Sequence, residues 1–368
     1  MHKKNKSMKL TSLIPEDAKK LLKVEGIELI KQLGEEVIRG VVFDVLCGKN
    51  IRDSTEMLTR KRLATLNAAM LMMFIKGFVI SDKFFEMFPK IAFNNLKKRQ
   101  KKEDKMIFQW MIGLTNKAFQ NILRDSPEAL DEYNEKYVNI CEEVIKNCKE
   151  TYGNLGGYFE VNSKERAELD WKFLIYFMNT IGAQTLAIRG SDKSMYGKFF
   201  EKLILGSLLT ILGFEYSKPE KAKKLKRIFW LSSRDEKRES DATLLFEAGK
   251  GVRFDIGFIG RGNPEITLDK VTRFERQIVL GHSKWYLATI IIVDRIGEKS
   301  SIVELAKRVG GTIIQMSMGY WPKKVAIELN RAINFQHELI KMPEENIKDY
   351  LHRKIMGIKL EKFLNIEN

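Results

Sequence analysis

The chain has 368 residues, of which 44% are hydrophobic and 30% charged, a composition typical of a globular protein long enough for two domains. Its 64 Lys and Arg residues against 48 Asp and Glu residues give a net charge of +16, which favours a polyanionic partner such as nucleic acid, although a merely solubilising surface would give the same balance. Three cysteines without a CxxC pair and four scattered histidines argue against a disulfide scaffold, a zinc ribbon and a paired-histidine metal site.

The first half of the chain has helical periodicity. Residues 1–20 are basic but lack the apolar segment and cleavage site of a signal peptide, so we expect a soluble cytoplasmic protein. From about 15 to 185, apolar residues recur at three- and four-residue spacings, which predicts a helical domain. The most apolar stretch, 63–80, contains Asn67 and Lys76 and is short for a membrane span. We therefore predict a buried helix there and no membrane partner.

A basic run, NLKKRQKKEDK at 95–105, interrupts the helical domain. It contains Lys97, Lys98, Arg99, Lys101, Lys102 and Lys105. Such a run is typical of a solvated helix surface, and it is equally the composition of an arm that contacts nucleic-acid phosphates. The sequence leaves both readings open, with Lys97, Lys98 and Arg99 as the candidate phosphate contacts.

After about residue 190 the pattern changes to strands alternating with helices. A helix that begins near Ser194 and ends at Gly213 is followed by a short strand. A short apolar piece lies at 228–233. Further strands are predicted at 242–246, 252–260, 285–294 and 311–317, and helices at 269–280, 301–310 and 325–341. This order predicts an α+β or α/β fold with a mixed sheet and helices on both faces. The expected domains are 1–190 (helical, for DNA binding or dimerisation), 191–345 (the core) and 346–368 (a C-terminal helical tail).

Two aspartates lie in otherwise apolar strands of this second half. The turn EAGKG, centred on Gly249 and Lys250, should join the strands into a hairpin that brings Asp241 close to Asp255. Two neighbouring carboxylates repel one another, and one would keep its proton unless a cation joined them. Mg²⁺ takes oxygen ligands and needs only one or two carboxylates, and it can polarise a phosphodiester. The sequence therefore predicts a magnesium site.

This pattern resembles the PD-(D/E)xK nuclease superfamily over about 195–317. The core of that superfamily is a helix with a glutamate, a hairpin with Asp and (D/E)xK, and then helix–strand–helix–strand. The resemblance implies a restriction-endonuclease-like sheet flanked by helices, with Glu201, Asp241 and Asp255 as metal ligands. The lysine position two residues after Asp255 is occupied by Gly257, so either the lysine has migrated or the register differs.

A second register keeps Asp255 in the site. VRFDIGFIG would then be the first hairpin strand and EITL the second, with Glu265 as the second acid and a further metal ligand. Lys270 arrives three residues after the usual lysine position, where Thr267 stands. The catalytic candidates are therefore, in order, Asp255, Lys270, Asp241 and Glu265. Each of the last three, like Glu201, has an ordinary alternative as a cap, strand-start or surface residue.

The remaining charged residues near this segment allow fewer assignments. Arg253 and Arg261 could bind phosphate or pair with the acids. The sequence has no GxxxxGK[ST] motif, so no nucleotide cofactor is expected. The residues that read the bases are usually Arg, Lys, Asn or Gln. Candidates lie in the helical domain and in residues 218–240, and the sequence does not distinguish among them.

A narrower resemblance rests on RFDIGFIGRGNPEITLDKVTRFER together with FWLSSRDEKRESDA. These segments are similar to type II restriction endonucleases of the CfrBI kind. That resemblance implies Mg²⁺-dependent cleavage of a short specific double-stranded DNA sequence by a homodimer, whose two-fold axis would match a palindromic site. Two alternatives stay open: a structure-specific repair or recombination nuclease, and a non-catalytic DNA-binding protein with a degenerate core, which the glycine at 257 favours.

Overall fold

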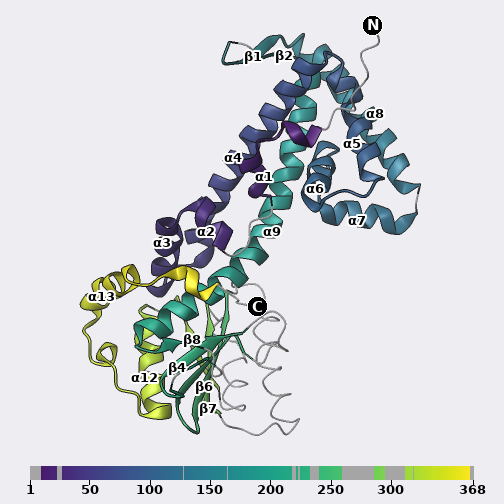
Figure 1. Cartoon of the computed structure of the whole chain (residues 1–368). Coiled ribbons are helices and arrows are strands. Elements are labelled where there is room, and N and C mark those ends of the chain that lie inside the picture. The colour runs from purple at the N-terminus through teal and green to yellow at the C-terminus, as the bar shows by residue number, and fades with distance from the viewer. Residues whose placement is uncertain are drawn as a thin grey trace. The chain divides into compact units, whose positions relative to one another are not determined.

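The computed structural model describes residues 10–22, 27–126, 128–163, 165–217, 221–222, 224–232, 240–258, 286–294, 311–317 and 319–364. The chain divides into two units (Figure 1). Unit 1 comprises Met1–Val24 and Leu58–Lys193, and unit 2 comprises Glu25–Met57 and Ser194–Asn368. The boundary predicted near 190 falls inside one continuous helix, α9 (Trp171–Ile211), which carries residues of both units.

Unit 1 is mainly helical, as its periodicity predicts. Its elements are η1 (Leu10–Leu13), α1 (Glu16–Lys20), most of α4 (Ile51–Ile80), α5 (Phe84–Leu96), α6 (Lys102–Met111), α7 (Asn116–Asp125), α8 (Ala129–Tyr152), β1 (Gly157–Val161), β2 (Glu165–Leu169) and the first part of α9. The antiparallel β1–β2 hairpin was not predicted, because the whole region was expected to be helical. It is anchored where the ring of Phe159 lies 5.3 Å from that of Phe173.

Aromatic side chains from three helices form the core of unit 1. The ring of Phe74 on α4 lies 4.9 Å from that of Phe88 on α5 and 5.8 Å from that of Phe173 on α9. By length and composition α4 alone among the described helices could cross a membrane, but 44% of its most apolar window is buried within the protein. Met73 and Phe74 are both fully buried. These contacts agree with the prediction of a core helix.

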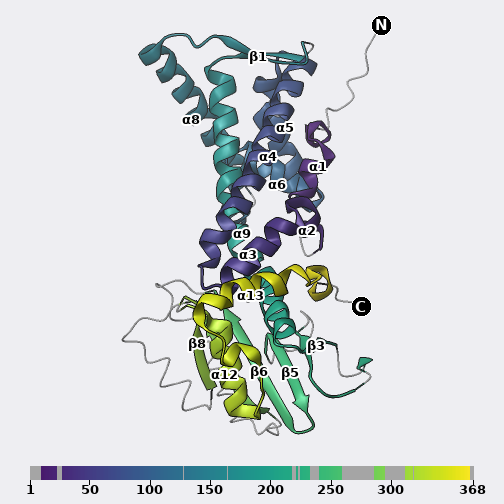
Figure 2. The same ribbon diagram turned by 90° about the vertical axis from the view of Figure 1, so that its left-hand side faces the viewer.

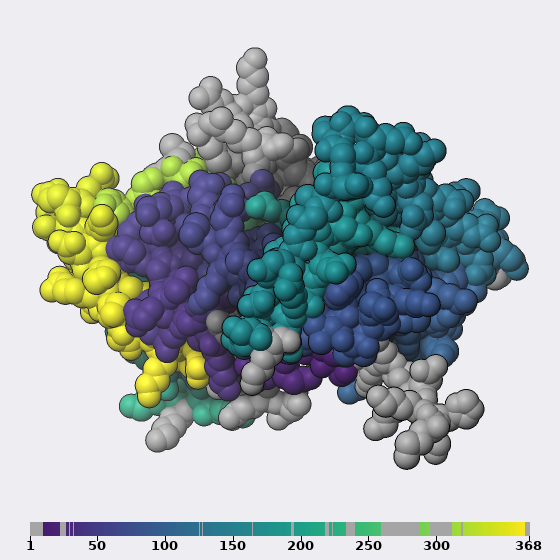
Figure 3. All heavy atoms as spheres, turned by 90° about the horizontal axis from the view of Figure 1, so that it is seen from above, coloured from purple at the N-terminus to yellow at the C-terminus, as the bar shows by residue number. Residues whose placement is uncertain are grey.

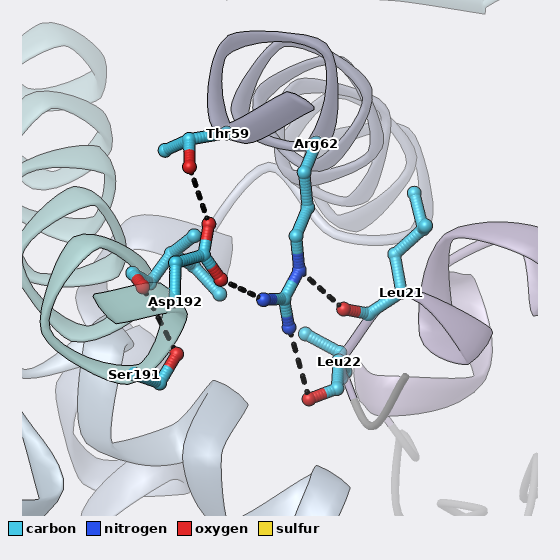
Figure 4. Close-up of polar contacts among 7 residues, drawn as sticks. Leu21, Leu22, Thr59, Arg62, Ser191 and Asp192 are labelled. Carbon is cyan, nitrogen blue, oxygen red and sulfur yellow. Dashed lines mark hydrogen bonds and ion pairs between the residues drawn. The ribbon is translucent and has the colours of Figure 1, made fainter. Parts of the chain in front are cut away.

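A buried polar cluster joins three segments of unit 1 (Figure 4). Arg62 on α4 pairs with Asp192 on α9, and Thr59 Oγ1 donates to Asp192 Oδ2 over 2.8 Å. Arg62 Nε also donates to the carbonyl of Leu21, just after α1, over 2.8 Å. The charges of both residues are thus met by hydrogen bonds, as buried ions require.

Unit 2 is built on a mixed six-stranded sheet in the order β3–β4–β5–β6–β7–β8. The strands are β3 (Glu215–Tyr216), β4 (Ile228–Leu231), β5 (Ala242–Glu247), β6 (Lys250–Gly257), β7 (Tyr286–Val293) and β8 (Gly311–Gln315). The pairs β4–β5 and β5–β6 are antiparallel, whereas β3–β4, β6–β7 and β7–β8 are parallel. The predicted α+β class and mixed sheet are confirmed. The helices predicted at 269–280 and 301–310 lie outside the described residues.

One face of the sheet is apolar throughout its centre. Residues of this face are at most 1% exposed: Ala242, Leu244, Val252, Phe254, Ile256, Ile290 and Ile292. Helix α12 (Trp321–Ile333) contacts β7 and β8. The end of β7 is buried on both faces, because Ile291 and Val293 on its other face are also 1% exposed.

The remaining elements of unit 2 come from both ends of the chain. They are α2 (Ile27–Leu33), α3 (Glu35–Leu46), η3 (Glu338–Ile340), α13 (Glu344–Met356) and η4 (Leu360–Phe363). Figure 2 shows α13 alongside α3, and in Figure 3 the yellow C-terminal residues lie beside the purple ones of α2 and α3. Arg39 Nη1 donates to the carbonyls of Ile355 and Ile358 over 2.6 and 2.7 Å.

These contacts differ from the predicted domains in two places. Residues 25–57, expected in the helical domain, belong to unit 2, and residues 346–368 are part of that unit and not a separate tail. The helix predicted at 325–341 ends at Ile333, because Asn334 adopts a left-handed conformation with φ +55°. Short polar Asn tolerates this conformation better than most residues, and it terminates the helix.

Candidate active site

The hairpin of β5 and β6 forms as the sequence predicts. Its turn contains Gly249 with φ +76°, a value that favours glycine, and Lys250 pairs with Glu247 across the turn. The register pairs Ala242 with Phe254, with one irregularity near the turn, between Leu245 and Glu247. The open end of the hairpin is therefore where residues 241 and 255 meet.

Asp241 is bonded to the residues on either side of Asp255. The backbone N–H of Asp241 donates to the carbonyl of Phe254 over 3.0 Å, and Asp241 Oδ2 accepts the N–H of Ile256 over 2.9 Å. The carboxylate of Asp241 thus continues the hydrogen-bonding of the hairpin beyond the last strand pair. The two aspartates lie side by side, and both are half-buried.

The second register stays a prediction. Strand β6 pairs with β7 from Gly251 to Gly257 and with β5 from Lys250 to Phe254, so the described ladder with β5 ends just before Asp255. The segment EITL, the second strand of that register, lies outside the described residues. Glu265 and Lys270, which that register brings in, lie outside the described residues, as does Arg261.

The face of the sheet that carries Asp255 is polar along the centre of the hairpin. Side chains two residues apart on a strand share a face, so Arg253 and Asp255 point to the same side of β6. In the strand register Arg253 lies opposite Thr243 on β5 and opposite Thr289 on β7, and it is 4% exposed. A guanidinium is always charged, so Arg253 places a buried positive charge on the face of β6 that carries Asp255.

The donor set is chemically suited to a hard divalent cation. Asp241 and Asp255 provide carboxylate oxygens, the ligands that Mg²⁺ prefers, and one or two of them suffice when water and phosphate oxygens complete the shell. Among the described residues, no group of three or more His, Cys, Asp or Glu side chains could hold a metal. Glu201 lies half-buried on the part of α9 that belongs to unit 2, and its participation stays a prediction.

A third aspartate at the same end of the sheet was not singled out from the sequence. Asp294 directly follows Val293, which pairs with Gly257, and it is 6% exposed. Asn50 Nδ2 donates to Asp294 Oδ2 over 2.6 Å, while Asn50 Oδ1 accepts the N–H of Arg52 at the start of α4 over 2.8 Å. Asp294 thus joins the end of β7 to the start of α4. The sequence feature that could have identified Asp294 is its position directly after the apolar run IIIV at 290–293.

The basic candidates of unit 1 lie between α5 and α6. Lys97, Lys98 and Arg99 are all exposed. Lys97 pairs with Asp131 on α8 and lies 4.8 Å from the ring centre of Phe93. Lys97 is therefore partly engaged within the unit, whereas its two neighbours extend the exposed basic surface.

Comparison with known proteins covers nearly the whole chain. The family model described as CfrBI restriction endonuclease matches residues 35–301. Over 355 residues the chain is 38% identical to the type II restriction enzyme CfrBI of Citrobacter freundii. This alignment covers 96% of this chain and 98% of that relative. No solved structure matches the chain.

Proposed function

The chain belongs to the CfrBI restriction endonuclease family and is a type II site-specific deoxyribonuclease; from this premise we propose that Asp255 and Asp241 form the centre at which it cuts double-stranded DNA. The observation that carries the proposal is the hydrogen bond from Ile256 N–H to Asp241 Oδ2, which holds the two acids together. Family membership favours this activity over a structure-specific repair nuclease or a non-catalytic binding protein.

Each described residue of the centre has a distinct role in this proposal. Asp255 and Asp241 would hold Mg²⁺, with Glu201 as a further ligand. When bound, the cation polarises the scissile phosphodiester and lowers the pKa of its water. Arg253 is too deeply buried to serve as a surface phosphate contact, so we assign it to pairing with the acids.

The lysine of the related nuclease motif is replaced, because Gly257 occupies its position at the end of β6. A cation is still needed to orient the attacking water and to neutralise charge that develops on the phosphate. Lys270 is our candidate for that role and Glu265 for an accompanying acid, with Arg261 as a phosphate contact. These three assignments rest on the sequence alone.

The wider proposal concerns fold, assembly and location. The mixed sheet of unit 2, with antiparallel β5–β6 and parallel β6–β7–β8, supports a restriction-endonuclease-like core. We propose that two chains form a homodimer, because a two-fold axis would present identical centres to the two strands of a palindromic site. The enzyme would act in the cytoplasm, and its helical unit would contribute to DNA binding.

The test is digestion of a long natural duplex DNA by the purified protein with Mg²⁺, followed by sequencing of the fragment ends. Wild type should give discrete fragments whose ends share one short sequence. Asp255→Asn should bind the DNA without cutting it, while Asp349→Asn, a matched change at an exposed aspartate of unit 2, should cut normally. Cutting by Asp255→Asn at the wild-type rate would show that the site is assigned wrongly.

A further inference from the structure

Helices α6 and α7 of unit 1 are connected by a tight turn that has specific backbone requirements. Figure 1 shows the chain changing direction between the two helices. Gly113 in this turn has φ +73°, and its N–H donates to the carbonyl of Trp110 over 2.9 Å. The N–H of Leu114 donates to the carbonyl of Gln109 over 2.9 Å. The turn is thus closed by backbone hydrogen bonds around a glycine in the left-handed region.

The second helix begins with a defined cap. Thr115 precedes α7, and its Oγ1 accepts the N–H of Ala118 over 3.3 Å. Gln109 of α6 donates from Nε2 to Asn116 Oδ1 at the start of α7 over 3.3 Å. The inner side of the pair is apolar, with Phe119 and Trp110 each 1% exposed. These contacts fix α7 against α6 as one element.

The outer face of α7 carries four polar side chains in one stripe. They are spaced at i, i+3, i+4 and i+7, all are exposed, and they comprise Lys117, Gln120, Asn121 and Arg124. Lys and Arg recognise guanine in the major groove by hydrogen bonding, and Asn and Gln recognise adenine. The stripe therefore has the donors and acceptors that read base edges.

Charge on the neighbouring elements agrees with a DNA-facing surface at this place. The segment 97–105, which leads from the end of α5 into α6, has six cations against two acids, and Lys98, Arg99, Lys101 and Lys102 are exposed. Helix α8, in contrast, has six acids against three lysines. A polyanion would therefore approach α6 and α7 and not the acidic surface of α8.

We propose that α6, the turn and α7 form a helix-turn-helix element in which α7 enters the major groove and reads part of the recognition sequence. In such elements the second helix contacts base edges and the first crosses the phosphate backbone. The side-chain amides on α7 suit the first of these roles, and the cations that precede α6 suit the second. The inference rests on the proposed cleavage of a specific duplex sequence. It assigns Gln120 and Asn121 to base recognition, and Lys98 and Arg99 to phosphate contacts.

The test is selection from a library of duplexes with a randomised centre, using the full-length protein with Asp255→Asn so that bound DNA is recovered uncut. The same protein with Gln120→Ala and Asn121→Ala added should lose discrimination at one or two base pairs of the selected motif, by about 10- to 100-fold per position. Asn139→Ala, which removes an exposed amide from α8, is the matched control and should leave the motif unchanged.

Phosphate contacts give a second, independent readout. Lys98→Ala with Arg99→Ala should weaken binding to all sequences and reduce the slope of log K against log salt by about 2, without altering the motif. An unchanged motif in the Gln120/Asn121 variant would overturn the assignment of α7, as would a library from which none of these proteins selects a motif. Failure of the wild type to cut DNA would count against the proposed function alone, because the selection requires no cleavage.

Discussion

Arg62 and Asp192 form an ion pair in the interior of unit 1, with only 3% and 4% of their side chains exposed (Figure 4). Removal of one partner leaves the other charge buried without compensation, which costs about 3–5 kcal/mol. We therefore expect Arg62→Met or Asp192→Leu alone to lower the free energy of unfolding by that amount, measured by urea denaturation. The double variant should recover most of the loss, because its two side chains are apolar.

A more exposed ion pair in the same unit provides the control. Lys172 lies 3.6 Å from Glu142, and the two side chains are 27% and 51% exposed. Lys172→Ala should cost less than about 1 kcal/mol, since solvent screens such pairs. If Lys172→Ala and Arg62→Met lowered the free energy of unfolding equally, burial would not explain the cost of breaking the Arg62–Asp192 pair.

Two glycines of unit 1 should respond to alanine with opposite signs. Gly113 has φ +73°, and a Cβ there would lie 3.3 Å from Tyr137 Cε2, so Gly113→Ala should destabilise unit 1 by about 1–2 kcal/mol. Gly182 lies within α9, and a Cβ added there would meet no neighbouring atom within 4 Å, so Gly182→Ala should stabilise the helix by about 0.5–1 kcal/mol. Thermal unfolding followed by circular dichroism would compare them. Stabilisation by Gly113→Ala would exclude the left-handed turn between α6 and α7.

Charge and hydrogen bonding at Asp241 can be separated by two substitutions. Asn at this position retains an oxygen that can accept the Ile256 N–H, whereas Ala removes it. We expect Asp241→Asn to keep the stability of the wild type but to raise the Mg²⁺ concentration for half-maximal cleavage by about 10- to 100-fold. Asp241→Ala should lose stability as well. A normal Mg²⁺ requirement in Asp241→Asn would assign this residue a purely structural role.

His337 should make unit 2 less stable in mild acid. Burial lowers the pKa of His337 below its ordinary value of 6.5, although Glu338 partly opposes the shift, and its Nδ1 accepts the Leu339 N–H over 3.2 Å. As the pH falls below 6.5, the unfolded chain binds a proton before the folded chain does. The stabilisation is thus complete above 6.5 and is lost as the pH falls through the lowered pKa.

The measurement is the free energy of unfolding from pH 7.5 to pH 5 for wild type and His337→Asn. Asparagine can accept the Leu339 N–H but does not titrate, so the variant should lose less stability over this range. The difference in slope has an upper limit of about 1.4 kcal/mol per pH unit for one proton. Parallel curves for the two proteins would show that His337 does not contribute.

The sheet of unit 2 was largely predictable because its signals are local. Runs of Val, Ile and Phe end at turn residues, so the predicted strands at 242–246 and 311–317 agree closely with β5 and β8. The hairpin followed from the EAGKG turn, and it brings Asp241 to Asp255. Glu265 and Lys270 lie outside the described residues, so the sequence remains the basis for their assignment.

The grouping of segments could not be predicted, because helical periodicity shows that a face is buried but not which core covers it. Helix α3 has the same pattern as the helices of unit 1, yet Trp321 Nε1 donates to the carbonyl of Val45 over 2.7 Å within unit 2. Asp294 was overlooked for a similar reason. Its partner Asn50 lies 244 residues away along the chain, and no local pattern connects them.

The position of β6 between two paired strands has a consequence for motion. Backbone amides along Val252–Ile256 are held in the interior of a sheet, so their exchange with deuterated solvent requires opening of the surrounding sheet and not fraying of an edge. Asp255 is thus carried by a strand that has paired neighbours on both sides. If DNA is bent or twisted on the enzyme, we expect the duplex and the peripheral elements to deform, while the carboxylate that we propose as a metal ligand stays in place.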